Sequence, residues 1–237
     1  MVIVFGAGFA FLGVGSGGLD LGQMIRDTFG SKGSSGVPSV SAALKRTHEH
    51  PRDPAAWKSY ADALEKKGRT NEAIGALENY TRLKPKDVPQ LNRLGRLEYS
   101  QADASAAVAQ AAYAQQQSVY ASSTFGPSQS SKLGQALGQD PITQALSTKV
   151  STSAQDATTK YSTASRKAVV TFQQVAKVAP GADSYFNLAQ AAEHFQNNKV
   201  ALGAYRSLLK YESDAGTKAR IRAKIAQLEA ALKKAGG

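Results

Sequence analysis

The chain has 237 residues, 42% of them hydrophobic, and its 29 basic and 18 acidic side chains give a formal net charge of +11. This length accommodates one large domain or two modest ones with a buried core. The absence of cysteine excludes disulfides, thiolate metal sites and a cysteine nucleophile. The charge is uneven, because residues 199–237 carry nine basic and three acidic side chains whereas residues 100–165 carry three of each. A basic end suits anionic lipid, acidic protein or nucleic acid, but no aromatic-and-basic pattern accompanies it, so nucleic acid is not the expected partner.

The N-terminal segment is apolar. Residues 2–19 contain no charged side chain, and as a helix they would reach roughly 27 Å, close to the thickness of a hydrocarbon core. We therefore predict a single transmembrane anchor at residues 1–19 and a flexible tether at residues 20–37, which are rich in glycine and serine. Gly13 and Gly17 have the spacing that lets another membrane helix pack closely. Nothing basic precedes the span, which suggests that Met1 is not the true start and leaves the orientation across the membrane open.

Two other interpretations of this segment stay open. A cleaved signal peptide lacks its basic first region here and has no convincing cleavage site. A dinucleotide-binding turn would use Gly6 and Gly8, but Phe11 stands at the third glycine position and no alternation of strands and helices follows.

A repeat follows the tether. A Pro-basic-Asp triplet begins at Pro51 and again at Pro85, 34 residues later, and the sequence between them reads as helix, turn, helix. Such a period is typical of stacked helical hairpins. The spacing of eight residues resembles that of the tetratricopeptide repeat family: Trp57, Tyr60, Ala61, Leu64, Gly68, Ala73, Leu77 and Pro85. The resemblance implies an all-α stack in which these residues form the core rather than a binding surface.

The same grid extends in both directions. Residues 39–51, with Ala43, fit the second helix of an incomplete earlier repeat. The next first helix contains Leu91, Leu94 and Gly95, and its matching second helix follows about sixty residues later. That second helix carries Ala168, Phe172 and Pro180. One further repeat carries Tyr185, Leu188, Ala189, Ala201 and Tyr205. A capping helix follows with Ile221, Ile225, Leu228 and Leu232. About three repeats therefore occupy residues 38–100 and 165–237, the last part ending in a basic capping helix.

Residues 101–164 interrupt the second repeat. Residues 102–121 favour a helix, Gly126 and Pro127 break it, and Asp140 with Pro141 begins another helix. Apolar or small residues then recur every three or four positions as far as Phe172. We predict a long antiparallel helical hairpin inserted in the repeat and protruding by roughly 40 Å. A flexible Ser/Gln/Ala-rich loop is the alternative. Large apolar residues are sparse in either version, which favours a partner surface or self-association.

No catalytic pattern stands out. There is no nucleophile motif, phosphate loop or pair of catalytic acids, and His48 and His50 fall on different helix faces, so we expect no enzyme, no metal site and no cofactor. The resemblance implies instead that first-helix residues line a concave groove for a partner's peptide or helix. These are Lys58, Asp62, Lys66, Asn92, Arg96, Tyr99, Phe186, Gln190 and His194.

The expected function is a membrane-tethered protein–protein interaction scaffold, similar to the small anchored repeat proteins of bacteria. It would be an adaptor or accessory subunit of a membrane-associated complex, with Lys58, Asn92 and Arg96 holding an acidic segment. One alternative is an envelope module whose basic last helix (Arg220, Arg222, Lys224) contacts anionic lipid or cell-wall polymer. The other is a dinucleotide-dependent enzyme that uses the Gly6/Gly8 turn. The identity of the partner and the oligomeric state do not follow from the sequence.

Overall fold

The computed structural model describes residues 38–123, 132 and 141–235. Every element in these residues is an α-helix, and none is a strand, which confirms the all-α prediction. The helices are α2 (Val40–Glu49), α3 (Pro54–Lys66), α4 (Thr70–Leu83), α5 (Val88–Ser123), α7 (Pro141–Val178), α8 (Ala182–His194), α9 (Asn198–Tyr211) and α10 (Ala215–Ala235). The predicted anchor at 1–19, its Gly13 and Gly17, and the tether at 20–37 lie outside the described residues. In the part that the structure describes, no helix is both long enough and apolar enough to span a bilayer.

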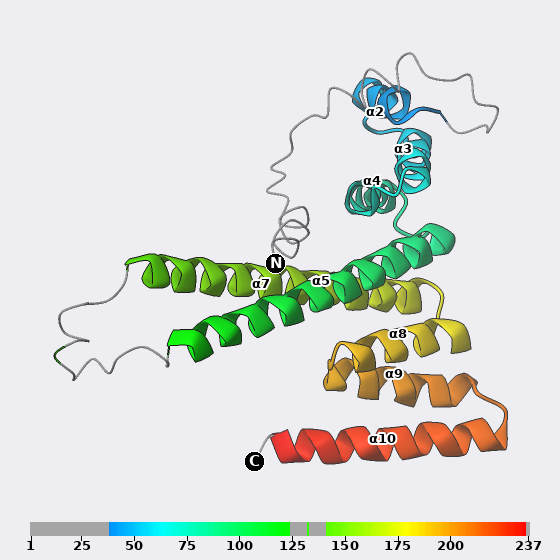
Figure 1. The fold of residues 1–237 in the computed structure, drawn as a ribbon. Helices are drawn as coiled ribbons and strands as arrows, with labels where there is room; N and C mark the ends of the chain where they lie inside the picture. Colours follow the sequence, from blue (N-terminus) through cyan, green and yellow to red (C-terminus); the bar gives the residue numbers. More distant parts are fainter. Residues whose placement is uncertain (1–37, 124–131, 133–140, 236–237) are drawn as a thin grey trace.

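The helices form a stack in which the extensive contacts join neighbours in chain order. α2 packs on α3, α3 on α4, α4 on α5, α5 on α7, and so on through α8, α9 and α10. Figure 1 shows α2–α4 at one end, the long α5 and α7 in the middle, and α8–α10 at the other end. This order of contacts is typical of solenoids built from helical hairpins.

Local signals explain where the helices begin. The Ser39 hydroxyl accepts a hydrogen bond from the Ala42 amide at the start of α2. Asp53 caps α3 in the same way by accepting from the Ala55 amide, and Pro54 takes the first helical position, where no amide donor is needed. Each cap satisfies an amide that the helix itself leaves without a partner.

Two clusters of buried side chains form the core. The N-terminal cluster joins α2, α3 and α4 to the start of α5 and includes Ala43, Leu64, Ala73, Leu77 and Leu94. The C-terminal cluster joins the end of α7 to α8, α9 and α10 and includes Phe172, Ala189, Ala201, Tyr205 and Ile221. Ala73 and Ala201 have no exposed surface, so each lets two helices approach closely, as the repeat pattern predicts.

Away from the stack, α5 and α7 touch mainly through small residues. Ala109, Ala154 and Ala157 are buried between them, together with Val150. Large apolar side chains on the same stretch stay exposed: Val108, Tyr113 and Leu146 are each between 46% and 49% exposed. The helices therefore lie close together but bury little apolar area, and much of that surface stays open to a partner.

Candidate functional site: a groove from α5 to α10

A groove lies where the first turns of α5 meet α7 and α8. It encloses a cavity of about 540 Å³ lined by Pro89, Asn92 and Arg96 of α5, Phe172 of α7, and Asp183, Phe186 and Asn187 of α8. Three predicted groove residues, Asn92, Arg96 and Phe186, therefore lie together. The sequence did not indicate Asp183 and Asn187. Both lie in the first two turns of α8, the first helix of the last repeat, and on its exposed side.

Gly95 brings the walls of this groove together. A Cβ atom placed on Gly95 would lie 3.1 Å from the Phe172 ring, closer than ordinary van der Waals contact. The glycine thus lets α7 approach α5 until the buried Phe172 ring forms one side of the cavity. The sequence grid had placed both residues in the core of the same repeat.

Asn92 is the most informative residue in the groove. Its Oδ1 atom is buried and has no hydrogen-bond partner among the described residues. An unsatisfied buried acceptor costs about 1–3 kcal/mol, so such groups usually have a partner. Beside it Arg96 and Asp183 are exposed, and the Phe186 ring is 45% exposed. The groove therefore offers an acceptor, a cation, a carboxylate and an apolar surface.

Tyr99 and His194 lie one to two turns further along and contact each other. Their rings stack with centroids 4.9 Å apart, and Phe195 packs against both. The His194 Nε2 atom is also 2.6 Å from the Asp103 carboxylate. Burial, and then the nearby Asp103 charge, raises the pKa of Tyr99. These two predicted residues are thus engaged in a contact between α5 and α8, while Gln190 on the same helix is exposed and does not line the cavity.

The predicted residues on α3 lie outside this cavity. Lys58 and Lys66 are exposed on α3. Asp62 binds Arg93 of α5, with its Oδ1 atom 2.6 Å from Nη1, and Glu65 accepts from Nε of the same guanidinium at 2.8 Å. Arg93, which the sequence did not single out, therefore holds α5 against α3 immediately beside Asn92. That Lys58 and Lys66 contact a ligand stays a prediction.

The groove continues onto α10. Asp183 and Phe186 also line a second cavity of about 340 Å³, whose other residues include Tyr205, Leu208 and Ile221. Near it, Glu193 binds Lys224 and accepts a hydrogen bond from the Tyr205 hydroxyl. Burial, followed by that hydrogen bond, raises the pKa of Tyr205. Arg220 and Arg222 are exposed, whereas Lys224 is engaged within the stack.

Nothing in the described residues points to a metal centre. No group of three or more histidine, aspartate or glutamate side chains in that part of the chain is placed to hold an ion. His48 and His50 are both exposed at the end of α2.

The comparison with protein families gives a match to the tetratricopeptide repeat at residues 34–88 and 165–218. These are the regions in which α2–α4, the end of α7, α8 and α9 form the stack. The chain is a tetratricopeptide repeat protein. Most of α5 and the first part of α7 lie between the two matched regions.

Other comparisons add little to this tetratricopeptide assignment. One similar crystal structure is that of a thermophilic tetratricopeptide repeat protein from Thermus thermophilus, whose sequence is 13% identical to this chain. The aligned region covers 80% of this chain and 88% of that protein, and the TM-score is 0.24. A search of curated protein sequences gives no match.

Proposed function

We propose that this chain is an adaptor that binds a segment of a partner protein in the groove from α5 to α10 and holds that partner at a membrane. Tetratricopeptide repeats generally mediate protein–protein interaction, and the buried Asn92 oxygen, which has no partner among the described residues, carries the proposal for this groove. A bound segment with an N–H group at that point would supply the missing donor. A carboxylate would pair with Arg96 through charge-assisted hydrogen bonds, and an apolar side chain would pack on Phe186.

The long helices fit the proposal that a repeat has been split. α5 begins, and α7 ends, inside the stack, where they pack on α4 and α8 as the two helices of one repeat would. The matches to the repeat family stop at residue 88 and resume at residue 165. We infer that residues 101–164 are an insertion between these two helices, formed largely by the outer parts of α5 and α7.

The membrane part of the proposal rests on the uncharged residues 2–19 alone. In this scheme they anchor the chain, residues 20–37 act as the tether, and the partner belongs to a membrane-associated complex.

Crosslinking in native membranes tests the groove. A photo-crosslinking amino acid replaces Phe186 in the full chain, and mass spectrometry identifies the partner and the linked segment. Asn92→Ala and Arg96→Ala each remove one polar contact to the bound segment. If that contact contributes about 1.4 kcal/mol of binding free energy, its loss lowers the affinity tenfold, and the crosslinking yield should fall about tenfold. Arg52→Ala, which removes an exposed arginine that does not line the cavity, is the matched control. Equal yields from all variants would refute binding in the groove.

Two other functions predict different results. An envelope module would use the exposed Arg220 and Arg222 with Lys224, so changing all three to Glu would abolish binding to anionic liposomes. A dinucleotide-dependent enzyme would use Gly6 and Gly8, which lie outside the described residues. It would purify with a flavin or nicotinamide visible in its absorption spectrum.

A further inference from the structure

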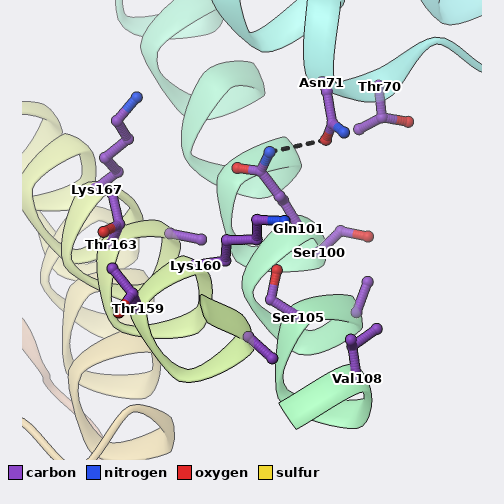
Figure 2. A pocket seen from close by; sticks show the side chains of 13 residues that line it. Thr70, Asn71, Ser100, Gln101, Ser105, Val108, Thr159, Lys160, Thr163 and Lys167 are labelled. Atoms are coloured by element: carbon purple, nitrogen blue, oxygen red, sulfur yellow. Dashed lines mark hydrogen bonds between the residues drawn. The ribbon is translucent and has the colours of Figure 1, made fainter. Parts of the chain in front are cut away.

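A further cavity, separate from the groove, lies beside the long helices on a different side of α5. It has a volume of about 650 Å³ and is bounded by the start of α4, residues 100–108 of α5 and residues 157–167 of α7 (Figure 2). At its rim the Gln101 amide donates a hydrogen bond of 2.8 Å to Asn71 Oδ1, which ties α5 to α4. We call this cavity the arm cavity.

The arm cavity and the groove face opposite ways. An α-helix turns through about 100° per residue, so positions nine residues apart lie about half a turn from each other. Asn92 and Gln101 are separated by this interval, and Arg96 and Ser105 are as well. Asn92 and Arg96 line the groove, whereas Gln101 and Ser105 line the arm cavity. A ligand in one site therefore does not occupy the other.

The lining of the arm cavity combines apolar surface with positive charge. Ala104, Val108, Ala157 and Ala164 supply the apolar part, and Val108 is 49% exposed. Lys160 and Lys167 are the charged residues among the described residues of the lining, which include no acidic side chain. The acid that pairs with Lys167 is Glu78 on α4, at 2.6 Å.

Lys160 is the cation without a counter-charge among the described residues. It makes no ion pair with a side chain that the structure describes, and Figure 2 shows it extending from α7 toward α5. Lys160 is exposed, so an anion can reach it from solvent, and the apolar lining beside it offers a second contact to the same ligand. The hydroxyl groups of Ser105 and Thr163 line the same space as further hydrogen-bond donors, whereas the Thr159 hydroxyl donates to the Gln155 carbonyl at 2.9 Å.

Most of this lining is absent from an ordinary repeat. Residues 100–108 and 157–164 fall between the two regions that match the repeat family. The arm cavity thus exists because α5 and α7 continue beyond the stack. We propose that it is a second docking site, which binds an amphipathic protein segment carrying acidic residues beside small apolar ones. The acidic side chain pairs with Lys160, and the apolar ones pack on Val108 and the alanines.

Peptide display on the full chain in detergent tests this site. A library of random dodecapeptides is selected against the wild-type chain, and an enriched peptide is then synthesised with a fluorophore and titrated by anisotropy. We expect enriched sequences to contain Asp or Glu next to apolar residues. Reversing the charge with Lys160→Glu should weaken binding of the synthetic peptide at least about tenfold.

Two matched variants make the result specific. Lys149→Glu reverses another exposed lysine of α7 that does not line the cavity, and Asn92→Ala alters the groove; neither should change the affinity. Enrichment without acidic residues, equal weakening by Lys149→Glu, or weakening by Asn92→Ala alone would each overturn the proposal. Sedimentation showing a dimer that Lys160→Glu dissociates would assign the site to a second copy of the chain instead. Because Asn92 serves only the groove, failure of one proposed site is distinguishable from failure of the other.

Discussion

At the scale of single residues, Glu98 is a buried carboxyl group at the point where α5 and α7 meet. It is 2% exposed, and its Oε2 atom accepts a hydrogen bond of 2.6 Å from the Thr171 hydroxyl. Burial raises the pKa of Glu98 to about 7, the Glu78 charge acts in the same direction, and Thr171 and Lys167 oppose it. The group therefore titrates near neutral pH inside the stack.

This shift predicts that stability falls as pH rises. An ordinary glutamate has a pKa of 4.5, so between that pH and about 7 the folded state binds one more proton than the unfolded state. The free energy of unfolding then decreases across this range by on the order of 3 kcal/mol. Urea denaturation at pH 4.5 and pH 7.5 measures the change. Glu98→Gln should remove most of it, whereas Asp156→Asn, at an exposed position, should leave it. If the free energy of unfolding of Glu98→Gln changed with pH as much as that of the wild type, the Glu98 carboxyl group would not be the cause of the pH dependence.

At the scale of elements, two turns of the stack have the same backbone pattern but different residues. Between α3 and α4, Gly68 has a φ of 70°, and the amides of Gly68 and Arg69 donate to the carbonyls of Glu65 and Leu64. Between α8 and α9, Gln196 has a φ of 57°. Here the amides of Gln196 and Asn197 donate to the carbonyls of Glu193 and Ala192. Both turns are helix C-terminal motifs that favour glycine.

Replacing Gln196 by glycine should therefore stabilise the protein. A side chain in the left-handed region costs roughly 1–2 kcal/mol, and glycine avoids most of this cost, so we expect Gln196→Gly to raise the free energy of unfolding by about 1 kcal/mol. Chemical denaturation measures it. Gln190→Gly, in the interior of α8, should instead lower the free energy by about 1 kcal/mol. A loss of stability in both variants would mean that Gln196 makes contacts that outweigh the backbone strain.

At the scale of the whole molecule, the stack and the outer parts of α5 and α7 are held by different contacts. The stack has two clusters of large buried side chains, and its helices touch in chain order. The outer parts of α5 and α7 bury alanines and Val150 between them and are also joined by side-chain hydrogen bonds, from Gln116 to Ser151 and from Thr158 to Tyr113. Stability in such arrays comes from contacts between neighbouring units, so the stability of the stack should not depend on the outer parts of α5 and α7.

Deleting residues 103–159 and joining the ends by a short flexible turn tests this independence. We expect a folded, shorter stack, because Leu91, Leu94, Phe172 and Val175 remain buried at the base of the two helices. Circular dichroism should show less helical signal in proportion to the residues of α5 and α7 that are removed, and thermal unfolding should stay cooperative. An unfolded variant would contradict both the separation of the parts and the inferred insertion.

The sequence by itself determined the fold class and the repeats. The 34-residue period and the alanines at the helix contacts follow from local spacing, because a helical hairpin buries the same positions in each repeat. The same grid indicated Asn92, Arg96 and Phe186, which the structure brings to one cavity. The anchor at 1–19 rests on hydropathy alone and stays a prediction.

Only the tertiary structure decided how the remaining site residues are used. It pairs Tyr99 with His194 and Asp62 with Arg93, and it leaves the Asn92 oxygen without a partner among the residues it describes. It also creates the arm cavity from segments of three helices, α4, α5 and α7, that are well separated in the sequence. The physical reason is the same in each case: periodicity tells which side of a helix is buried, but the rotation and crossing of two packed helices decide which side chains meet.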